Sequence, residues 1–310
     1  MLRILVLGAA AGGGFPQWNS NSDACNRARR GDSAAKARTQ SSIAVSTDGD
    51  HWYLFNASPD LRQQINDNAQ LHPKNGLRHS PISGVVLTNA DVDHVTGLLT
   101  LRESAPLMIY GSERVLGTLA ANSIFNVMNP DFVQRNTIEL GSTFVPEARD
   151  GTPSGLEIET FAVPGKVALY LEDASAGENF GTREGDTVGL MVRETETGTS
   201  FFYIPGCAAM PEELSQRLTG APLVLFDGTL FENDEMISRN EGIKTGQRMG
   251  HMSMTGSDGT IAAFESLGVE RRVFIHINNT NPVLLDDSDE RAVVEAAGWE
   301  VAWDGMEIKL

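Results

Sequence analysis

The stretch Thr88-Asn-Ala-Asp-Val-Asp-His-Val-Thr-Gly-Leu98 contains the densest group of polar side chains in the chain and decides its fold. A short apolar run precedes it and an apolar periodic segment at residues 95–101 follows, which predicts a buried strand, a turn and a helix. In an extended turn Asn89, Asp91 and Asp93 point the same way, and His94 adds an imidazole beside them. Carboxylates so close together repel each other unless a cation neutralises them, so the pattern predicts a metal site. The alternative is that Asp91 or Asp93 only caps the following helix.

Short strands and helices extend outward from this stretch over the whole chain. Upstream, we expect a strand at residues 2–8, followed by a long polar loop at residues 12–38 whose glycines lie near the active site. Asp48-Gly49 predicts a hairpin turn between strands at residues 42–46 and 52–56. Ser58 as N-cap and Pro59 in the first turn predict a helix to about residue 66. Downstream, strands are expected at residues 107–110, 156–163, 167–171, 188–193, 201–204, 223–226, 273–277 and near 301, and helices at residues 113–121, 212–217, 257–267 and 287–297.

The organisation favours one domain over residues 1–310, because no Pro- or Ser-rich linker separates the hairpins from the strand–helix units. Such a chain is expected to form packed sheets with outer helices. The acidic, glycine-rich residues 172–186 predict a solvated loop, and a lid over the site is the alternative.

Charge and cysteine content limit the partners and the compartment. The formal net charge of −17 opposes binding to nucleic acids and to anionic membranes, because both kinds of binding depend on Lys and Arg. No apolar run approaches the roughly 20 residues that span a bilayer, and residues 2–7 are too short for a signal peptide. Cys25 and Cys207 are far apart and indicate no disulfide framework, so we expect a cytoplasmic protein.

The central stretch resembles the His-x-His-x-Asp-His signature of the metallo-β-lactamase fold, an α/β (αββα) sandwich of two mixed β-sheets with outer helices. Asn89 and Asp91 stand at the first two histidine positions, whereas Asp93 and His94 match the signature. The resemblance implies that His276, which ends the strand at residues 273–277, joins the same metal as Asp93 and His94. A structural hydrogen-bonding role is the alternative for a histidine at a strand end.

Two further positions of this fold family have changed. Gly165 stands where a third histidine is usual, and Cys207 where a bridging aspartate is usual. The resemblance therefore implies that one of two metal sites is lost and that Asp93, His94 and His276 hold the remaining one. Two histidines and one carboxylate are the ligands of non-haem Fe(II) oxygenases, and zinc is the alternative metal in purified protein.

Asp227 and His251 resemble positions near the metal in the ribonuclease Z and phosphonate-pathway phosphodiesterase branches of the fold. There they would assist proton transfer or hold a ligand in place. As alternatives, Asp227 satisfies turn amides and His251 is an ordinary loop histidine.

The altered motif at residues 89–94 is similar to that of the pyrroloquinoline quinone (PQQ) biosynthesis protein B family. The similarity extends to four other stretches, at residues 12–19, 39–45, 56–60 and 276–282. This resemblance implies Fe(II)- and O₂-dependent hydroxylation of the tyrosine ring in a small Glu-Tyr substrate excised from a precursor peptide. Asn89 and Asp91 would orient water or substrate, and Asp227 and His251 would move protons. Other pathway proteins and further copies of the chain are the remaining expected partners. The alternatives are a carrier or exporter of the finished quinone and a metal-dependent hydrolase.

Overall fold

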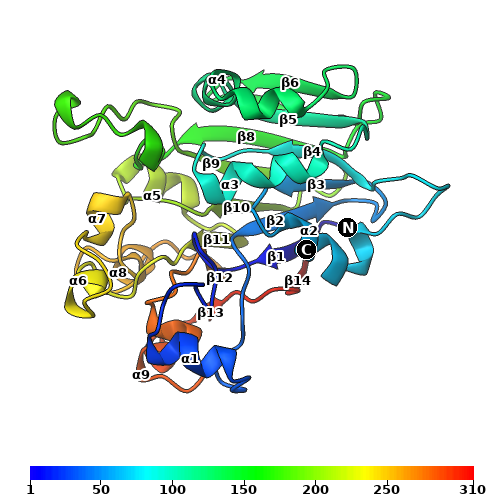
Figure 1. The fold of residues 1–310 in the computed structure, drawn as a ribbon. Helices are drawn as coiled ribbons and strands as arrows, with labels where there is room; N and C mark the ends of the chain where they lie inside the picture. The colour runs from blue at the N-terminus through cyan, green and yellow to red at the C-terminus, as the bar shows by residue number, and fades with distance from the viewer.

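Two β-sheets of seven strands each pack face to face with helices on both outer sides, in a computed structural model that describes residues 1–310 (Figure 1). The first sheet has the order β14-β1-β2-β3-β4-β5-β6. It is antiparallel from β14 to β3 and parallel from β3 to β6. Its strands are β1 (Arg3–Gly8), β2 (Ser42–Ser46), β3 (Trp52–Phe55), β4 (Ile82–Val86), β5 (Leu107–Ser112), β6 (Val133–Ile138) and β14 (Glu307–Lys309).

The second sheet has the order β13-β12-β11-β10-β9-β8-β7 and is also mixed. The strands from β10 to β13 run parallel, and those from β7 to β10 run antiparallel. They are β7 (Thr143–Phe144), β8 (Leu156–Ala162), β9 (Val188–Glu194), β10 (Ser200–Ile204), β11 (Leu223–Asp227), β12 (Arg271–Ile275) and β13 (Trp299–Val301). The predicted α/β sandwich is therefore confirmed.

The core has three apolar layers because each sheet buries both faces. One layer fills the space between the sheets, with Phe55, Phe201 and Tyr203 among its members. A second layer lies on the outer face of the first sheet and contacts α2, α4 and the residues after α3. The third layer lies on the outer face of the second sheet and contacts α5, α8 and α9. The helices are α1 (Asp23–Arg29), α2 (Leu61–Asp67), α3 (Val92–Val95), α4 (Glu113–Ala121), α5 (Glu212–Leu218), α6 (Glu235–Ser238), α7 (Gly246–Met249), α8 (Thr260–Phe264) and α9 (Asp289–Ala296). None of them is long and apolar enough to cross a membrane.

Several predicted elements are wrong. Residues 167–171 form no strand; Leu169–Leu171 is a 3₁₀ turn that bonds to the segment before α3. The predicted loop at residues 12–38 contains α1, whose N-cap Ser22 accepts a hydrogen bond from the amide of Cys25. The helix predicted at residues 257–267 shortens to α8.

The capping prediction for α2 is also wrong. Ser58 donates its hydroxyl to the side chain of Gln64 instead of capping the helix, and Asp60 occupies the N-cap position. Strands β6, β7 and β14 were not predicted. The sequence of β6 is largely polar and half-exposed at a sheet edge, so it lacks the alternation that indicates a strand.

Candidate metal centre

The polar turn after β4 is held rigidly at the end of the first sheet. Thr88 donates its amide to Oδ1 of Asn56 at 2.9 Å, and the Asn56 amide donates to the Thr88 hydroxyl, also at 2.9 Å. Gly97 packs so closely on the preceding segment that a Cβ there would lie 2.2 Å from the carbonyl oxygen of Ser58. These contacts fix the position of α3, which carries Asp93 and His94.

The second sheet brings further polar groups to the same edge. Strands β10, β11 and β12 are parallel, so the residues at their carboxyl ends lie together. Cys207 follows β10, Asp227 ends β11 and His276 follows β12. His276 has a φ of 60°, which is uncommon for a non-glycine residue and turns its side chain sharply out of the strand direction.

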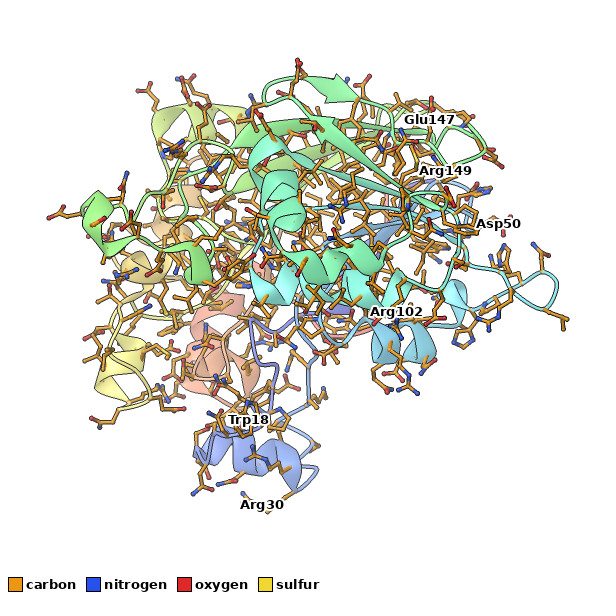
Figure 2. All side chains as sticks on the ribbon, turned by 45° about the horizontal axis from the view of Figure 1, so that its top comes forward. Trp18, Arg30, Asp50, Arg102, Glu147 and Arg149 are labelled. Atoms are coloured by element: carbon orange, nitrogen blue, oxygen red, sulfur yellow. The ribbon has the colours of Figure 1, made fainter.

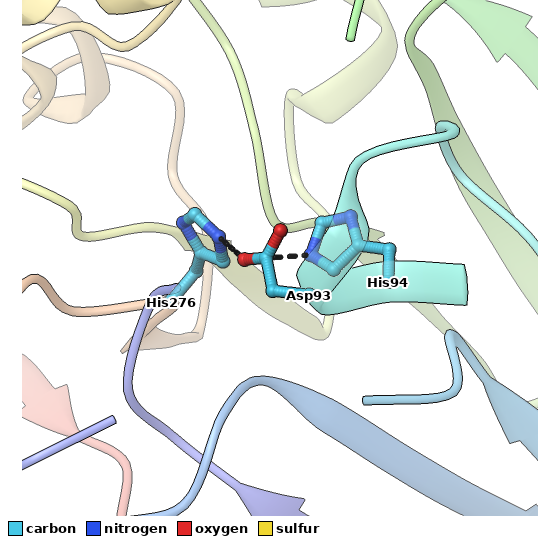
Figure 3. Close-up of side chains that lie close together, drawn as sticks. All are labelled: Asp93, His94 and His276. Atoms are coloured by element: carbon cyan, nitrogen blue, oxygen red, sulfur yellow. Dashed lines mark hydrogen bonds and ion pairs between the residues drawn. The ribbon is translucent and has the colours of Figure 1, made fainter. Parts of the chain in front are cut away.

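Asp93, His94 and His276 meet between the two sheets (Figure 3). The Asp93 carboxylate lies between the two imidazoles, with Oδ2 at 3.1 Å from Nε2 of His276 and 4.0 Å from Nε2 of His94. Both histidines are buried, and the Asp93 side chain is only 14% exposed. The structure thus brings together the three residues that the sequence predicts as metal ligands.

Hydrogen bonds set the tautomer of His94. Its Nδ1 lies 2.6 Å from Oδ1 of Asn89, and the same oxygen accepts the amide of Asp91, which identifies it as the amide oxygen. Because an amide oxygen only accepts, Nδ1 of His94 carries the proton and Nε2 carries the lone pair. That Nε2 is buried and has no hydrogen-bond partner.

Thr229 orients His276 in a comparable way. The Thr229 hydroxyl donates to Oδ1 of Asp227 at 2.6 Å and therefore accepts from Nδ1 of His276, which lies 2.8 Å away. Nε2 of His276 is left to face Asp93. Thr229 was not singled out in the sequence, although its position two residues after a strand-end aspartate was a usable signal.

The three residues fit a divalent metal. A buried nitrogen with no partner is unfavourable by about 1–3 kcal/mol, and a cation at Nε2 of His94 would satisfy it. Two imidazole nitrogens and a carboxylate oxygen suit both Fe(II) and Zn(II). The unpartnered Nε2 of His94 is therefore the observation that indicates a metal here.

Burial and neighbouring charges favour the metal-binding forms of His94 and Asp93, whereas His276 would have to release a proton to bind a metal. Burial lowers the pKa of His94 to about 4, so its imidazole is neutral at pH 7. Burial opposes ionisation of Asp93, but His94 and the hydrogen bond from His276 outweigh it and hold the pKa of Asp93 below its ordinary value. For His276 burial is likewise outweighed by Asp93, which raises the pKa of His276.

Asp227 and His251 lie beside this triad but are differently engaged. The carboxylate of Asp227 is fully buried and accepts four hydrogen bonds, from the amide and hydroxyl of Thr229, the amide of Cys207 and Nδ1 of His251. The His251 contact measures 2.6 Å, and the His251 ring stacks on His276 with centroids 5.2 Å apart. Asp227 thus satisfies turn amides and pairs with His251 at once, which leaves it no oxygen free for a metal.

The positions of the second metal site hold no ligand set. A Cβ at Gly165 would lie 2.5 Å from Oγ1 of Thr187, so Thr187 fills the space of a side chain there. The Cys207 thiol donates to the carbonyl of Ala209 at 3.1 Å, and burial raises its pKa to about 12. Neither position supplies a ligand. Asp227, His251 and His276 also lie close enough together for a metal, but this group shares His276 with the triad, and Asp227 and Nδ1 of His251 already bond to each other.

Asp91 and Asn89 take positions beside the triad. Asp91 occupies the N-cap position of α3, but its carboxylate makes no capping bond and accepts instead the amide of Leu169 at 3.2 Å. Burial, together with the charge of Asp93, raises the pKa of Asp91 to about 6. The Asn89 oxygen lies behind His94, so its expected contact with water or substrate stays a prediction. Gly12 runs close beside the site, since a Cβ there would lie 3.5 Å from Asp93 Oδ2.

A groove of about 1110 Å³ lies at the opposite end of the parallel strands of the first sheet. Asp50 and Arg149, two of its lining residues, are on one side of the molecule in Figure 2, whereas Trp18 projects from the segment next to α1. The groove mixes acidic and basic side chains and holds none of the metal-ligating triad. The carboxyl ends of the strands are therefore the better candidate site.

Comparisons with known proteins agree with this arrangement. The sequence profile of the beta-lactamase superfamily domain matches residues 51–277. Coenzyme PQQ synthesis protein B of Gluconacetobacter diazotrophicus is 55% identical over 99% of both chains, and that of Methylorubrum extorquens strain AM1 is 52% identical over the whole of both.

Solved structures give the same result. The crystal structure of Zn²⁺-bound PqqB from Methylobacterium extorquens superposes with a TM-score of 0.94, at 52% identity, over 99% of this chain and 100% of that one. A diphosphatase of the PhnP family has a TM-score of 0.70 at 17% identity, over 99% of this chain and 96% of that one, a likeness of fold alone.

Proposed function

The chain belongs to the coenzyme PQQ synthesis protein B family, within the metallo-β-lactamase fold, and from this premise we propose that it is a PQQ biosynthesis enzyme. The proposed step is hydroxylation of the tyrosine ring in a small Glu-Tyr substrate to a quinone-type product, with Fe(II) as cofactor and O₂ as co-substrate. One oxygen atom of O₂ enters the ring and the other leaves as water, so the ring itself supplies the electrons. The observation that carries the proposal is the triad of Asp93, His94 and His276, in which His94 presents a buried, unpartnered Nε2.

The ligand set favours iron chemistry over hydrolysis. A redox metal with open coordination positions supplies the activation of O₂, and two histidines with one carboxylate leave such positions, whereas zinc has no redox chemistry. Two-metal hydrolysis needs a second set of ligands, and Gly165 and Cys207 supply none. The zinc in the related PqqB crystal structure supports a metal in this family without fixing which metal is active.

The surrounding residues then have distinct tasks. Asn89 and Thr229 are positioning residues, because they act through the imidazoles of His94 and His276. Asp227 holds His251 by Nδ1, which leaves Nε2 of His251 to accept a proton from the phenol. Asp91, next to the ligands, would contact water or substrate.

The test uses protein purified without oxygen and loaded with Fe(II). O₂ consumption is measured with Glu-Tyr as substrate, and the product is examined for added oxygen by mass spectrometry. Iron-dependent uptake with a hydroxylated product is expected, and zinc-loaded protein should be inactive. Tight binding of PQQ without O₂ uptake would instead indicate a carrier, and turnover of a generic phosphodiester at ordinary enzymatic rates a hydrolase.

A further inference from the structure

Two cations and one carboxylate form a compact cluster next to the metal centre. Glu172 accepts a hydrogen bond from the ammonium of Lys166 at 2.6 Å and from both terminal nitrogens of Arg248, at 3.1 and 2.7 Å. The chain has only 24 Lys and Arg residues against 41 Asp and Glu. An excess of positive charge at this point therefore stands out against an acidic protein.

The cluster lies at the rim of the site and not elsewhere on the surface. Lys166 packs on Gly250, where a Cβ would lie 3.1 Å from Cγ of Lys166, and Gly250 directly precedes His251. Three residues after Lys166, the amide of Leu169 bonds to Asp91. The segment that carries Lys166 therefore reaches from His251 to the turn that precedes α3.

Arg248 is held in one orientation. Its guanidinium forms a fork on Glu172 and stacks on the ring of Phe180 at 3.5 Å. Phe180 itself has a φ of 54°, an uncommon conformation for an aromatic residue. A guanidinium that is fixed before a ligand arrives loses less entropy when it binds one.

The cluster also has unused hydrogen-bonding capacity. Each terminal nitrogen of Arg248 makes one bond to Glu172, Nε makes none, and the Lys166 ammonium makes one bond out of three. The Arg248 and Lys166 side chains remain 28% and 16% exposed. Two cations against one carboxylate leave a formal charge of one positive unit that faces solvent.

We propose that Lys166 and Arg248 form a recognition site for a carboxylate group of the substrate, with Glu172 as the residue that sets their spacing. The inference rests on the proposed function in that a Glu-Tyr substrate carries such carboxylates beside the ring to be oxidised. Arg and Lys donors bind carboxylates through short, charge-assisted hydrogen bonds. The segment at residues 172–186 then takes part in substrate recognition, as in the lid alternative to a solvated loop, since Glu172 and Phe180 both belong to it.

The experiment measures binding to zinc-loaded protein by calorimetry, so that no turnover is needed. The two probes are Glu-Tyr and Gln-Tyr-amide, which lacks both carboxylates. In Arg248→Met we expect the affinity for Glu-Tyr to fall about tenfold and the affinity for Gln-Tyr-amide to change less than twofold. Glu172→Gln should weaken Glu-Tyr binding more than Gln-Tyr-amide binding, because Lys166 and Arg248 then lose the charge that fixes their spacing.

Arg271→Met is the matched control. Arg271 forms the same kind of fork on Glu300, at 2.6 and 2.9 Å, at the far end of β12. This variant should bind both probes as the parent protein does. Circular dichroism of each variant checks that the fold is intact.

Other outcomes contradict the inference. Equal weakening of both probes in Arg248→Met or in Glu172→Gln would mean that the cluster only fastens the loop. Failure of the parent protein to bind either probe would also overturn the inference. Carboxylate-selective binding without iron-dependent O₂ uptake would uphold the subsite and overturn the oxygenase instead.

Discussion

The site has two halves that contain the same residue types but use them differently. The first half lies on the α3 side and the second on the β11 side. On the α3 side, the His94 imidazole uses Nδ1 on Asn89 and keeps a buried Nε2 with no partner. On the β11 side, both oxygens of Asp227 are fully occupied by hydrogen-bond donors. The difference teaches that a cluster of acids and histidines is a ligand set only where lone pairs remain free. This difference supports the proposal that the first half binds the metal and that the second positions groups and moves protons.

The largest effect is expected from changes in the first half. His94→Ala, His276→Ala and Asp93→Ala should each abolish tight iron binding and Fe(II)-dependent O₂ uptake with Glu-Tyr, because three ligands leave no redundancy. Circular dichroism should show an intact fold. Metal content and rate are measured on the same samples. Full iron and full activity in His276→Ala would require the site to be rebuilt around Asp91, Asp227 or His251.

Changes in the second half should separate iron content from rate. Asp227→Asn and His251→Gln should keep the iron and slow turnover by roughly 10²–10⁴-fold, as expected when a group that moves a proton is removed. His51→Gln is the matched control, because His51 forms the same Nδ1–carboxylate pair with Asp48, at 2.8 Å, on the surface and away from the site. Loss of iron from His251→Gln would place His251 among the ligands.

A smaller effect is expected where the two halves meet, at Thr229. Thr229→Val removes the hydroxyl that holds His276 while it keeps the shape, and should weaken metal affinity by roughly 10–100-fold. Thr229→Ser keeps the hydroxyl and should restore most of the affinity. Competition with a metal chelator measures both variants. Equal affinity in the Val and Ser variants would show that the hydroxyl does not orient His276.

The smallest effect concerns the lost ligand position. Gly165→Ala places a Cβ against Thr187 and should reduce the free energy of unfolding by about 1–3 kcal/mol without a change in metal content. Gly117→Ala, in α4 with nothing within 4 Å of the added Cβ, is the control and should be neutral or stabilising. Denaturant unfolding measures both. A neutral Gly165→Ala would mean that Thr187 yields easily and that the space could have held a ligand.

Much of this arrangement could be predicted from the sequence because its signals are local. The hairpin around Asp48-Gly49, most strands of the two sheets and the turn before α3 follow from turn chemistry and apolar runs. The grouping of Asp93 and His94 with His276, far along the chain, came from the family resemblance. No local pattern joins positions so distant.

The rest depends on contacts between distant segments. Residues 167–171 are apolar enough to suggest a strand, yet their amide and hydroxyl donors bond to Asp91 and Ala90, which makes them a cover beside the metal centre. The role of Thr229 appears only when β11 and β12 lie side by side. The direction of the Asn89 oxygen likewise follows from the fold and not from its place in the motif.

The central claim is that the chain holds one catalytic metal, on Asp93, His94 and His276. The most direct measurement is the number of Fe(II) ions retained per chain after anaerobic loading and removal of weakly bound metal, determined by elemental analysis alongside O₂ uptake. We expect one iron per chain, with activity proportional to its occupancy. Two tightly held metals per chain in this pocket, both needed for activity, would contradict the account.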